Sequence, residues 1–255
     1  MFRMVRILVL LLILLLAAAG TWLARARTTS WEHTLRVVVF PIDADGSPAT
    51  RAYVAGLDRA SFQAIDEFFV EEGRRYGVPL SDPVDVFLAP EIRALPPPAP
   101  RGGNLAQVML WSLQLRFWAW RHARYDGPAP DIRIFVLYHD PARVQRVPHS
   151  LGLQKGLLGV VYAFASEEQA GPNSVVIAHE LLHTLGATDK YDPVTNLPLH
   201  PLGYADPQRD PLWPQDHAEI MAGRIPLSSR QAEMPAGLAQ TLVGPGTALE
   251  IRWLR

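Results

Sequence analysis

Cysteine is absent from the 255 residues of the chain. Its absence excludes disulfide bonds, thiolate zinc sites and a cysteine nucleophile, so any metal ligands must be histidine, aspartate or glutamate side chains. An excess of charge is also lacking, because 24 Lys and Arg residues stand against 25 Asp and Glu residues and the formal net charge is -1. Without a basic excess, we expect no nucleic-acid partner.

Long apolar runs are scarce except at the N-terminus, where one extends from Ile7 to Ala24 between two arginine-containing flanks. Its length of about 18 residues is close to the minimum that spans a bilayer, and small residues near its end fit a signal-peptidase site. We expect residues 1–30 to be a signal anchor or signal peptide with a short linker. Residues 31–255 would then form one catalytic domain in the cell envelope, outside the cytoplasm, anchored through this transmembrane helix or secreted after its cleavage.

Segments typical of strands and of helices alternate after Trp31 without an internal repeat, which predicts an α+β fold. Runs rich in β-branched and aromatic residues predict strands at Leu35–Ile42, Val84–Pro90, Asp131–Tyr138 and Gly156–Ala165. Apolar residues at helical spacing and cap residues predict helices at Asp58–Tyr76, from Asn104 onward, and from Ser228 or Ser229 through Glu233. Lys190 to His217 has no periodicity and predicts a long irregular loop.

The segment that follows Asn104 is apolar nearly all round the expected helix. Either this helix packs on both sides, or its tryptophans, such as Trp118 and Trp120, rest on a membrane surface. We favour packing on both sides, because aromatic residues at helical spacing usually belong to a core.

The stretch AHELLHTLGATDKYD, residues 178–192, predicts a metal site on a helix. The helix is expected to begin near Pro172 and to end at Gly186. His179 and His183 are separated by about 40° around the helix axis, so both can reach one ion. Glu180 lies one step round, where it can act as a base instead of a ligand. Two histidines and a glutamate on a buried helix need partners, and a metal ion supplies one.

The third ligand of this site is expected to be Asp189. Gly186 permits a left-handed turn directly after the helix, and this turn brings Asp189 back towards the two imidazoles. Two nitrogens, one oxygen and a water molecule make an open, catalytic Zn2+ site. The alternatives are ligands from later in the chain, namely Glu219, His200 or His217.

The pattern His179-Glu180-x-x-His183-x-x-Gly186-x-x-Asp189 resembles the zinc signature of the metzincin metallopeptidases, in the variant of snapalysin-type enzymes that has aspartate as third ligand. The continuation to Asp192 is similar to that of immune-inhibitor-type peptidases. This resemblance implies a zincin-like fold with a twisted, mainly parallel or mixed sheet and an active-site helix.

The same resemblance implies roles for individual residues. His179, His183 and Asp189 would be zinc ligands, Glu180 the general base and acid, and Met221 the methionine of a turn beneath the metal. One departure is Gly223, which stands where astacin-like members have a tyrosine, so no residue is assigned to transition-state stabilisation; Tyr191 and Tyr204 lie in the same loop region without a matching position.

The expected activity is hydrolysis of peptide bonds by a zinc metallopeptidase, more in the manner of an endopeptidase than of an exopeptidase. The strand at Gly156–Ala165 would offer an open edge to an extended peptide substrate, or else lie inside the sheet. Two other functions remain open: a membrane-anchored zinc-binding module without peptidase activity, and a zinc amidase that acts on cell-wall material. The partners expected are a peptide or protein substrate and, through the N-terminal helix, the membrane. Oligomeric state cannot be read from the sequence.

Overall fold

A five-stranded mixed sheet forms the centre of the computed structural model, which describes residues 4–7, 11, 12, 15, 20, 27–100, 104–153 and 157–254. The strands are arranged in the order β2-β1-β3-β5-β4. The first four are parallel to one another, whereas β4 pairs antiparallel with β5 at the edge. Their bounds are β1 (Leu35–Asp43), β2 (Val84–Leu88), β3 (Ile132–His139), β4 (Leu151–Leu153) and β5 (Leu158–Phe164).

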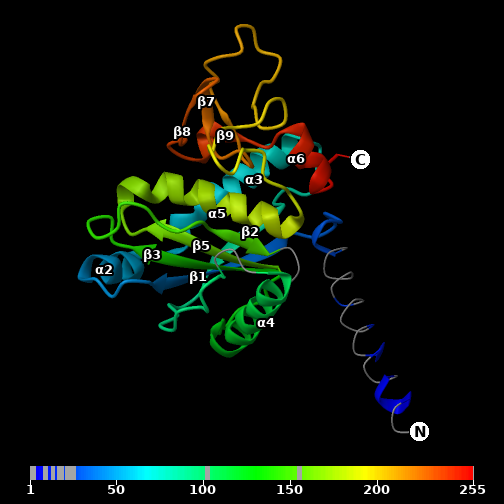
Figure 1. Cartoon of the computed structure of the whole chain (residues 1–255), viewed down its shortest axis with the longest axis vertical. Coiled ribbons are helices and arrows are strands. Elements are labelled where there is room, and N and C mark those ends of the chain that lie inside the picture. The colour runs from blue at the N-terminus through cyan, green and yellow to red at the C-terminus, as the bar shows by residue number, and fades with distance from the viewer. Residues whose placement is uncertain are drawn as a thin grey trace.

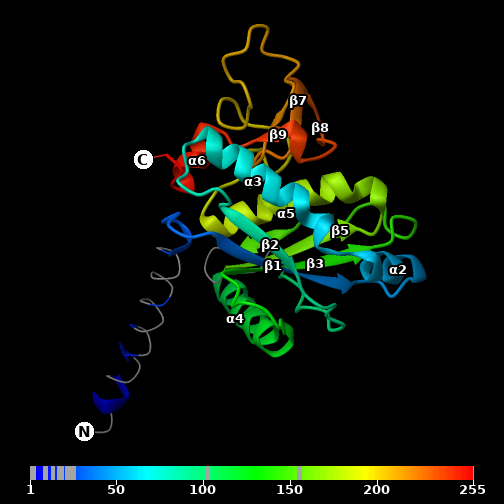
Figure 2. The same ribbon diagram turned by 180° about the vertical axis from the view of Figure 1, so that it is seen from behind.

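Helices cover both faces of this sheet (Figures 1 and 2). On one face lie α3 (Gln63–Arg75) and α5 (Ala170–Leu185), and on the other lies α4 (Leu105–His122). Successive residues of a strand point to opposite faces, so Val37 and Val39 of β1 join the core beneath α3 and α5, while Val38 and Phe40 join the core beneath α4. Burial on both faces explains the continuous apolar runs of the central strands.

A smaller, mostly irregular region lies on the far side of α5 from the sheet (Figure 1). Its elements are β6 (Ala218–Glu219), β7 (Ile225–Ser228), β8 (Gln231–Glu233), β9 (Thr241–Leu242) and α6 (Pro245–Glu250). The remaining short elements are α2 (Pro48–Gly56) and the 3-10 helices η1 (Arg59–Phe62), η2 (Glu167–Gln169) and η3 (Leu238–Gln240). The predicted loop from Lys190 to His217 is confirmed, with only isolated bridges within it.

The four predicted strands and the helix that begins after Asn104 are confirmed, and Asn104 caps that helix with a reciprocal hydrogen bond to Gln107. The predicted helix from Ser228 or Ser229 to Glu233 is wrong. These residues form the turn and second strand of the β7–β8 hairpin, in which Ile225 pairs with Glu233. Cross-strand pairing of the buried Ile225 end outweighs a weak local preference for helix.

The helix α5 also begins earlier than predicted, at Ala170. Pro172 is tolerated in its first turn, where a backbone N–H has no helical partner. Asn173 does not cap the helix. Its side chain instead accepts a hydrogen bond from Phe164 N and donates one to Phe164 O, which fixes α5 to the end of β5.

The fold is α+β with a mixed sheet, but the prediction of an N-terminal transmembrane or signal helix is contradicted. Among the described residues, no helix combines the length and the apolar character needed to cross a bilayer. The longest helix described, α4, has 18 residues but includes Arg116, Arg121 and two glutamines, which lower its hydropathy. Most of the segment from Ile7 to Ala24 lies outside the described residues.

Candidate metal centre

The helix α5 presents His179, Glu180 and His183 at its C-terminal end. Leu181, Leu182 and Leu185 of the same helix are fully buried in the core, so the orientation of the helix is fixed. Gly186 ends the helix in the left-handed conformation, with φ of 109°, and its N–H donates to the carbonyl of His183. This is the turn expected from the sequence, and only glycine adopts it without strain.

Both imidazole rings are held by backbone carbonyls. His179 Nδ1 lies 2.9 Å from Ile220 O, and His183 Nδ1 lies 2.8 Å from Ala187 O. Because a carbonyl only accepts hydrogen bonds, each Nδ1 carries a proton, and each Nε2 is the ring nitrogen that faces Asp189 and is left for a metal ion. The rings are nearly perpendicular, with centroids 4.7 Å apart. This is how metal-binding histidines are commonly oriented.

Asp189 lies where a third ligand would be needed. Its Oδ1 is 3.2 Å from His179 Nε2 and 3.0 Å from His183 Nε2. Ligands of a tetrahedral zinc ion, at about 2.0 to 2.1 Å from the metal, lie roughly 3.3 Å from one another. Asp189 Oδ1 therefore lies from each Nε2 at almost the spacing that such an ion requires.

Glu180 is buried, and its Oε2 has no hydrogen-bond partner within the described structure. Gly152 in β4 lies directly against this residue. The ligand atom of Glu180 and those of His179 and His183 all lie within 4.8 Å of one another. A buried carboxylate oxygen without a partner is costly, which is consistent with a position that meets a metal-associated water or a substrate group.

The two carboxyl groups of the site differ in acidity. Burial raises the pKa of Glu180 above its usual range, although the nearby charges of His179 and His183 oppose this effect. Burial acts in the same direction on Asp189, but its hydrogen bonds with the two histidines outweigh burial and hold the pKa of Asp189 well below its usual range. A carboxylate that stays ionised suits a ligand, and one that accepts a proton readily suits an acid and base.

The methionine turn predicted at Met221 lies against these histidines. Ile220, one residue before it, supplies the carbonyl that holds His179, and Met221 is fully buried. The carboxylate of Glu219 accepts hydrogen bonds from the N–H groups of Met221 at 2.7 Å and Ala222 at 3.0 Å, which shapes the turn. Gly223 closes it with φ of 67°.

None of the alternative ligands is brought to the two histidines. The second carboxylate oxygen of Glu219 accepts hydrogen bonds from Gly244 N at 3.1 Å and from Thr247 Oγ1 at 2.6 Å. His200 contacts the carbonyl of Pro207, and His217 lines a different cavity, next to α3. The structure therefore brings together His179, Glu180, His183 and Asp189, and it gives Glu219 a structural role.

The loop that carries Asp189 is fixed by the C-terminal helix α6. The carboxylate of Glu250 accepts hydrogen bonds from Thr188 N at 2.9 Å, Thr188 Oγ1 at 2.6 Å and Lys190 Nζ at 2.7 Å. Lys190 is itself buried, and its N–H donates to Met221 O at 3.0 Å. Both residues that flank Asp189 are thus anchored, and no local sequence pattern indicates this role for Glu250.

A cleft of about 340 Å3 opens onto His179 and Glu180. The edge strand β4 lies beside it, and a Cβ on Gly152 would lie 2.4 Å from His183 Cβ. Of the two arrangements expected for Gly156–Ala165, the one inside the sheet is confirmed and the open edge is wrong, because β5 pairs with both β3 and β4. The open edge on this side of the described sheet belongs to β4, a three-residue strand without a periodic signal in the sequence.

Cationic and aromatic side chains complete the lining of this cleft, among them Arg146, His149 and Arg224. Tyr191 also lines it, with its ring centroid 6.4 Å from that of His179. Burial, followed by the negative charges of Asp189 and Glu180, raises the pKa of the Tyr191 hydroxyl, so this group stays protonated and can donate a hydrogen bond. Tyr204 lies elsewhere, where its hydroxyl accepts from Trp213 Nε1.

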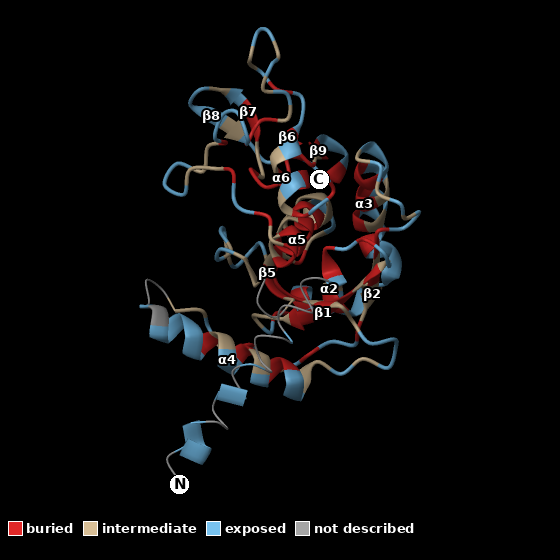
Figure 3. Cartoon of the chain, turned by 90° about the vertical axis from the view of Figure 1, so that its right-hand side faces the viewer, coloured by how far each residue is buried: buried red, intermediate tan, exposed pale blue. Residues whose placement is uncertain are grey.

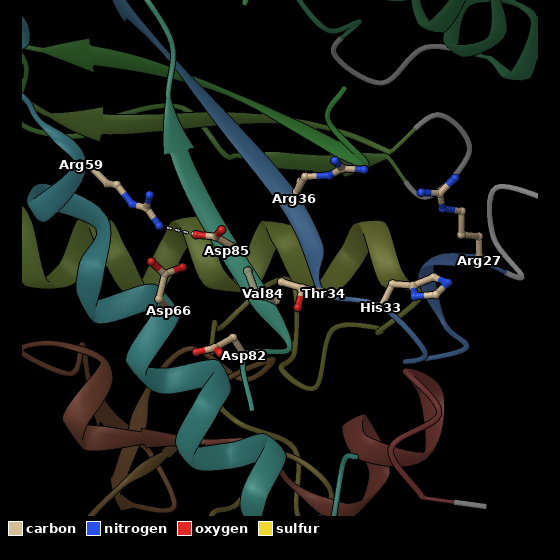
Figure 4. A pocket seen from close by; sticks show the side chains of 9 residues that line it. All are labelled: Arg27, His33, Thr34, Arg36, Arg59, Asp66, Asp82, Val84 and Asp85. Atoms are coloured by element: carbon tan, nitrogen blue, oxygen red, sulfur yellow. Dashed lines mark hydrogen bonds and ion pairs between the residues drawn. The ribbon is translucent and has the colours of Figure 1, made fainter. Parts of the chain in front are cut away.

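A second cavity lies around the start of β1 and β2 (Figure 4). Arg59 pairs there with Asp85, and Asp66 points towards the same region from α3. Charges of both signs line this cavity. Its histidine, His33, lies apart from the carboxylates, unlike the histidines beside α5 (Figure 4).

No protein-family model matches the chain, and no curated relative matches its sequence. The functional assignment therefore depends on the geometry of the residues around α5.

Proposed function

We propose that the chain is a zinc-dependent peptidase, with His179, His183 and Asp189 as the residues that hold Zn2+ and Glu180 as general base and acid. One observation carries this proposal: two oriented Nε2 atoms converge on Asp189 Oδ1 beside a buried glutamate oxygen without a partner. When bound, Zn2+ would lower the pKa of a water molecule and polarise the scissile carbonyl.

The residues of the chain have separate tasks in this reaction. Glu180, with its raised pKa, takes the proton of the attacking water and later gives it to the leaving amine. The free edge of β4 aligns an extended peptide by backbone hydrogen bonds, which favours cleavage within a chain over removal of terminal residues. The Tyr191 hydroxyl donates a hydrogen bond to the carbonyl oxygen as negative charge develops on it.

Substitution of Glu180 by glutamine tests the proposal. The full chain should bind about one Zn2+ per molecule and cleave an unfolded protein such as casein. Glu180→Gln removes the base but no ligand, so zinc content should be unchanged while the cleavage rate falls at least about 100-fold. The measurements are metal content by mass spectrometry and release of labelled fragments.

Glu168→Gln, at an exposed position in η2, is the matched control and should keep full activity. Unchanged cleavage by Glu180→Gln with zinc still bound would refute the assigned base. Zinc binding by the unmodified chain without cleavage of any peptide would refute peptidase activity and point to a binding module or to another amide substrate. The predicted location outside the cytoplasm stays a prediction.

A further inference from the structure

The helix α4 has an apolar face that the fold leaves uncovered. Its inner side chains Trp111, Leu115 and Trp118 are buried against β1 and β3. On the outside, five large apolar side chains are between 57% and 79% exposed. These five residues, here called the outer stripe, are Met109, Leu110, Leu113, Phe117 and Trp120. Figure 3 shows the helix at the border of the molecule, with buried and exposed segments alternating along it.

The outer stripe is continuous along the helix. At 100° per residue, its five members fall within an arc of about 100°, directly opposite the buried side chains. Solvent-exposed apolar residues that occur singly need no explanation, whereas a continuous patch of this size marks an interaction surface. Packing on both sides, the arrangement favoured from the sequence, is therefore wrong for the described part of the chain.

Basic residues border the outer stripe on both sides. On the helical wheel, Arg116 precedes it and Arg121 follows it, and α4 contains no acidic residue. The ion pairs among the described residues include neither arginine. An apolar arc with Phe and Trp, bordered by arginines, is the pattern of helices that lie in the interface of an anionic membrane.

We propose that the outer stripe of α4 docks onto the surface of an anionic lipid bilayer, with the helix axis parallel to the bilayer plane. The apolar side chains would enter the boundary of the acyl chains, and Arg116 and Arg121 would meet lipid phosphates. The charge of the helix disfavours a second copy of the chain as occupant. In a symmetric pair, two basic helices would face each other without an acidic partner from either one.

The position of α4 is compatible with this docking. It lies on the face of the sheet opposite α5 and the C-terminal region (Figures 1 and 2). A bilayer beneath α4 would thus leave the cleft beside β4 and α5 open to solvent and to substrates. The proposal does not depend on the peptidase activity proposed above, because it concerns a different face of the molecule.

The lack of cysteine permits a direct test with one introduced label in the full chain. Phe117→Cys, modified with an environment-sensitive fluorophore, should shift its emission to the blue when phosphatidylcholine vesicles containing phosphatidylglycerol are added. Brominated lipids should quench it at least about twofold, and high salt should weaken the response. Pure phosphatidylcholine vesicles should have a smaller effect.

Val194→Cys is the matched control, because Val194 is also apolar and is 88% exposed but lies in the irregular loop that follows α5. Its label should remain in water even if another segment brings the protein to the vesicles. Arg121→Gln should reduce the vesicle response of the label at position 117, whereas Arg230→Gln in the β7–β8 turn should leave it unchanged.

Three results would overturn the proposal. In the first, the chain sediments with the vesicles but the label at position 117 stays in water. In the second, that label shifts without vesicles and the shift grows with protein concentration, which would identify a second copy as occupant. In the third, it shifts without vesicles at every concentration, which would mean that a segment of the same chain covers the stripe.

Discussion

Asp189 is the residue on which the proposed metal site depends most. Among the described residues, its Oδ1 is the only oxygen atom that contacts Nε2 of both histidines, at 3.0 and 3.2 Å. Asp189→Ala removes this ligand while leaving the histidines on a well-packed helix. We expect zinc affinity to fall at least about tenfold, measured by competition with a chelating dye.

The matched control for this change is Asp126→Ala, at an exposed position on the loop between α4 and β3. It should bind zinc as the unmodified chain does. Loss of zinc in both variants would indicate a general effect on folding, and unchanged affinity in Asp189→Ala would exclude Asp189 as a ligand. Circular dichroism at the same protein concentration distinguishes a folded variant from an unfolded one.

At the scale of elements, the turn after α5 joins the helix to the ligand loop. Gly186 has φ of 109°, which a residue with a Cβ adopts only at a cost. Gly186→Ala should lower the free energy of unfolding by about 1 kcal/mol or more, because the helix end is strained. It should also weaken zinc binding, since Asp189 follows this turn by three residues.

Gly56→Ala is the control for this second prediction. Gly56 also ends a helix, α2, but it has an ordinary φ, and a Cβ there would meet no atom within 4 Å. Its substitution should leave stability unchanged or raise it slightly. Urea unfolding measures both variants, and equal effects at the two glycines would contradict the assigned role of the left-handed turn.

The elements differ in how far the sequence predicts them. The proposed ligands His179 and His183 and the turn at Gly186 are local patterns, so they can be predicted from residue spacing alone. The short strand β4 carries no periodic signal, and its place beside Glu180 follows from pairing with β5. In the sequence, this strand is a single glycine, Gly152, between two leucines.

Contacts between distant residues are the part that no local pattern predicts. The carbonyl that holds His179 belongs to Ile220, 41 residues later, and Glu250 acts on Lys190 across 60 residues. Glu219 was an alternative ligand because glutamate binds zinc, yet burial among backbone N–H groups makes it structural. Residue types in the sequence predict the chemistry of the site, whereas tertiary packing determines which of the candidate residues take part in it.

At the scale of the whole molecule, Asp66 couples stability to pH. Burial raises its pKa from 3.8 to about 6, which the hydrogen bond from Val86 N only partly opposes, and the charge of Asp85 adds to the rise. Between these pH values the folded chain holds a proton that the unfolded chain releases. The free energy of unfolding should therefore fall as pH rises through this window.

Asp66→Asn should flatten this part of the pH profile, measured by urea unfolding at several pH values between 4 and 7. Asp82→Asn removes a neighbouring carboxylate in the same cavity, whose charge is the smallest of the causes that raise the pKa of Asp66, so as the matched control it should keep most of the slope (Figure 4). The charges that face Asp66 also include Arg59, which favours its ionised form. An identical slope in the chain and in Asp66→Asn would mean that another group titrates.

The clamp of Glu250 on Thr188 and Lys190 has a consequence for local unfolding. Both neighbours of Asp189 are held by Glu250 of α6, whereas the histidine helix is held by its own packing in the core. A local opening of α6 would therefore release the loop of Asp189 while His179 and His183 keep their places. The proposed third ligand would then be the first part of the site to be lost.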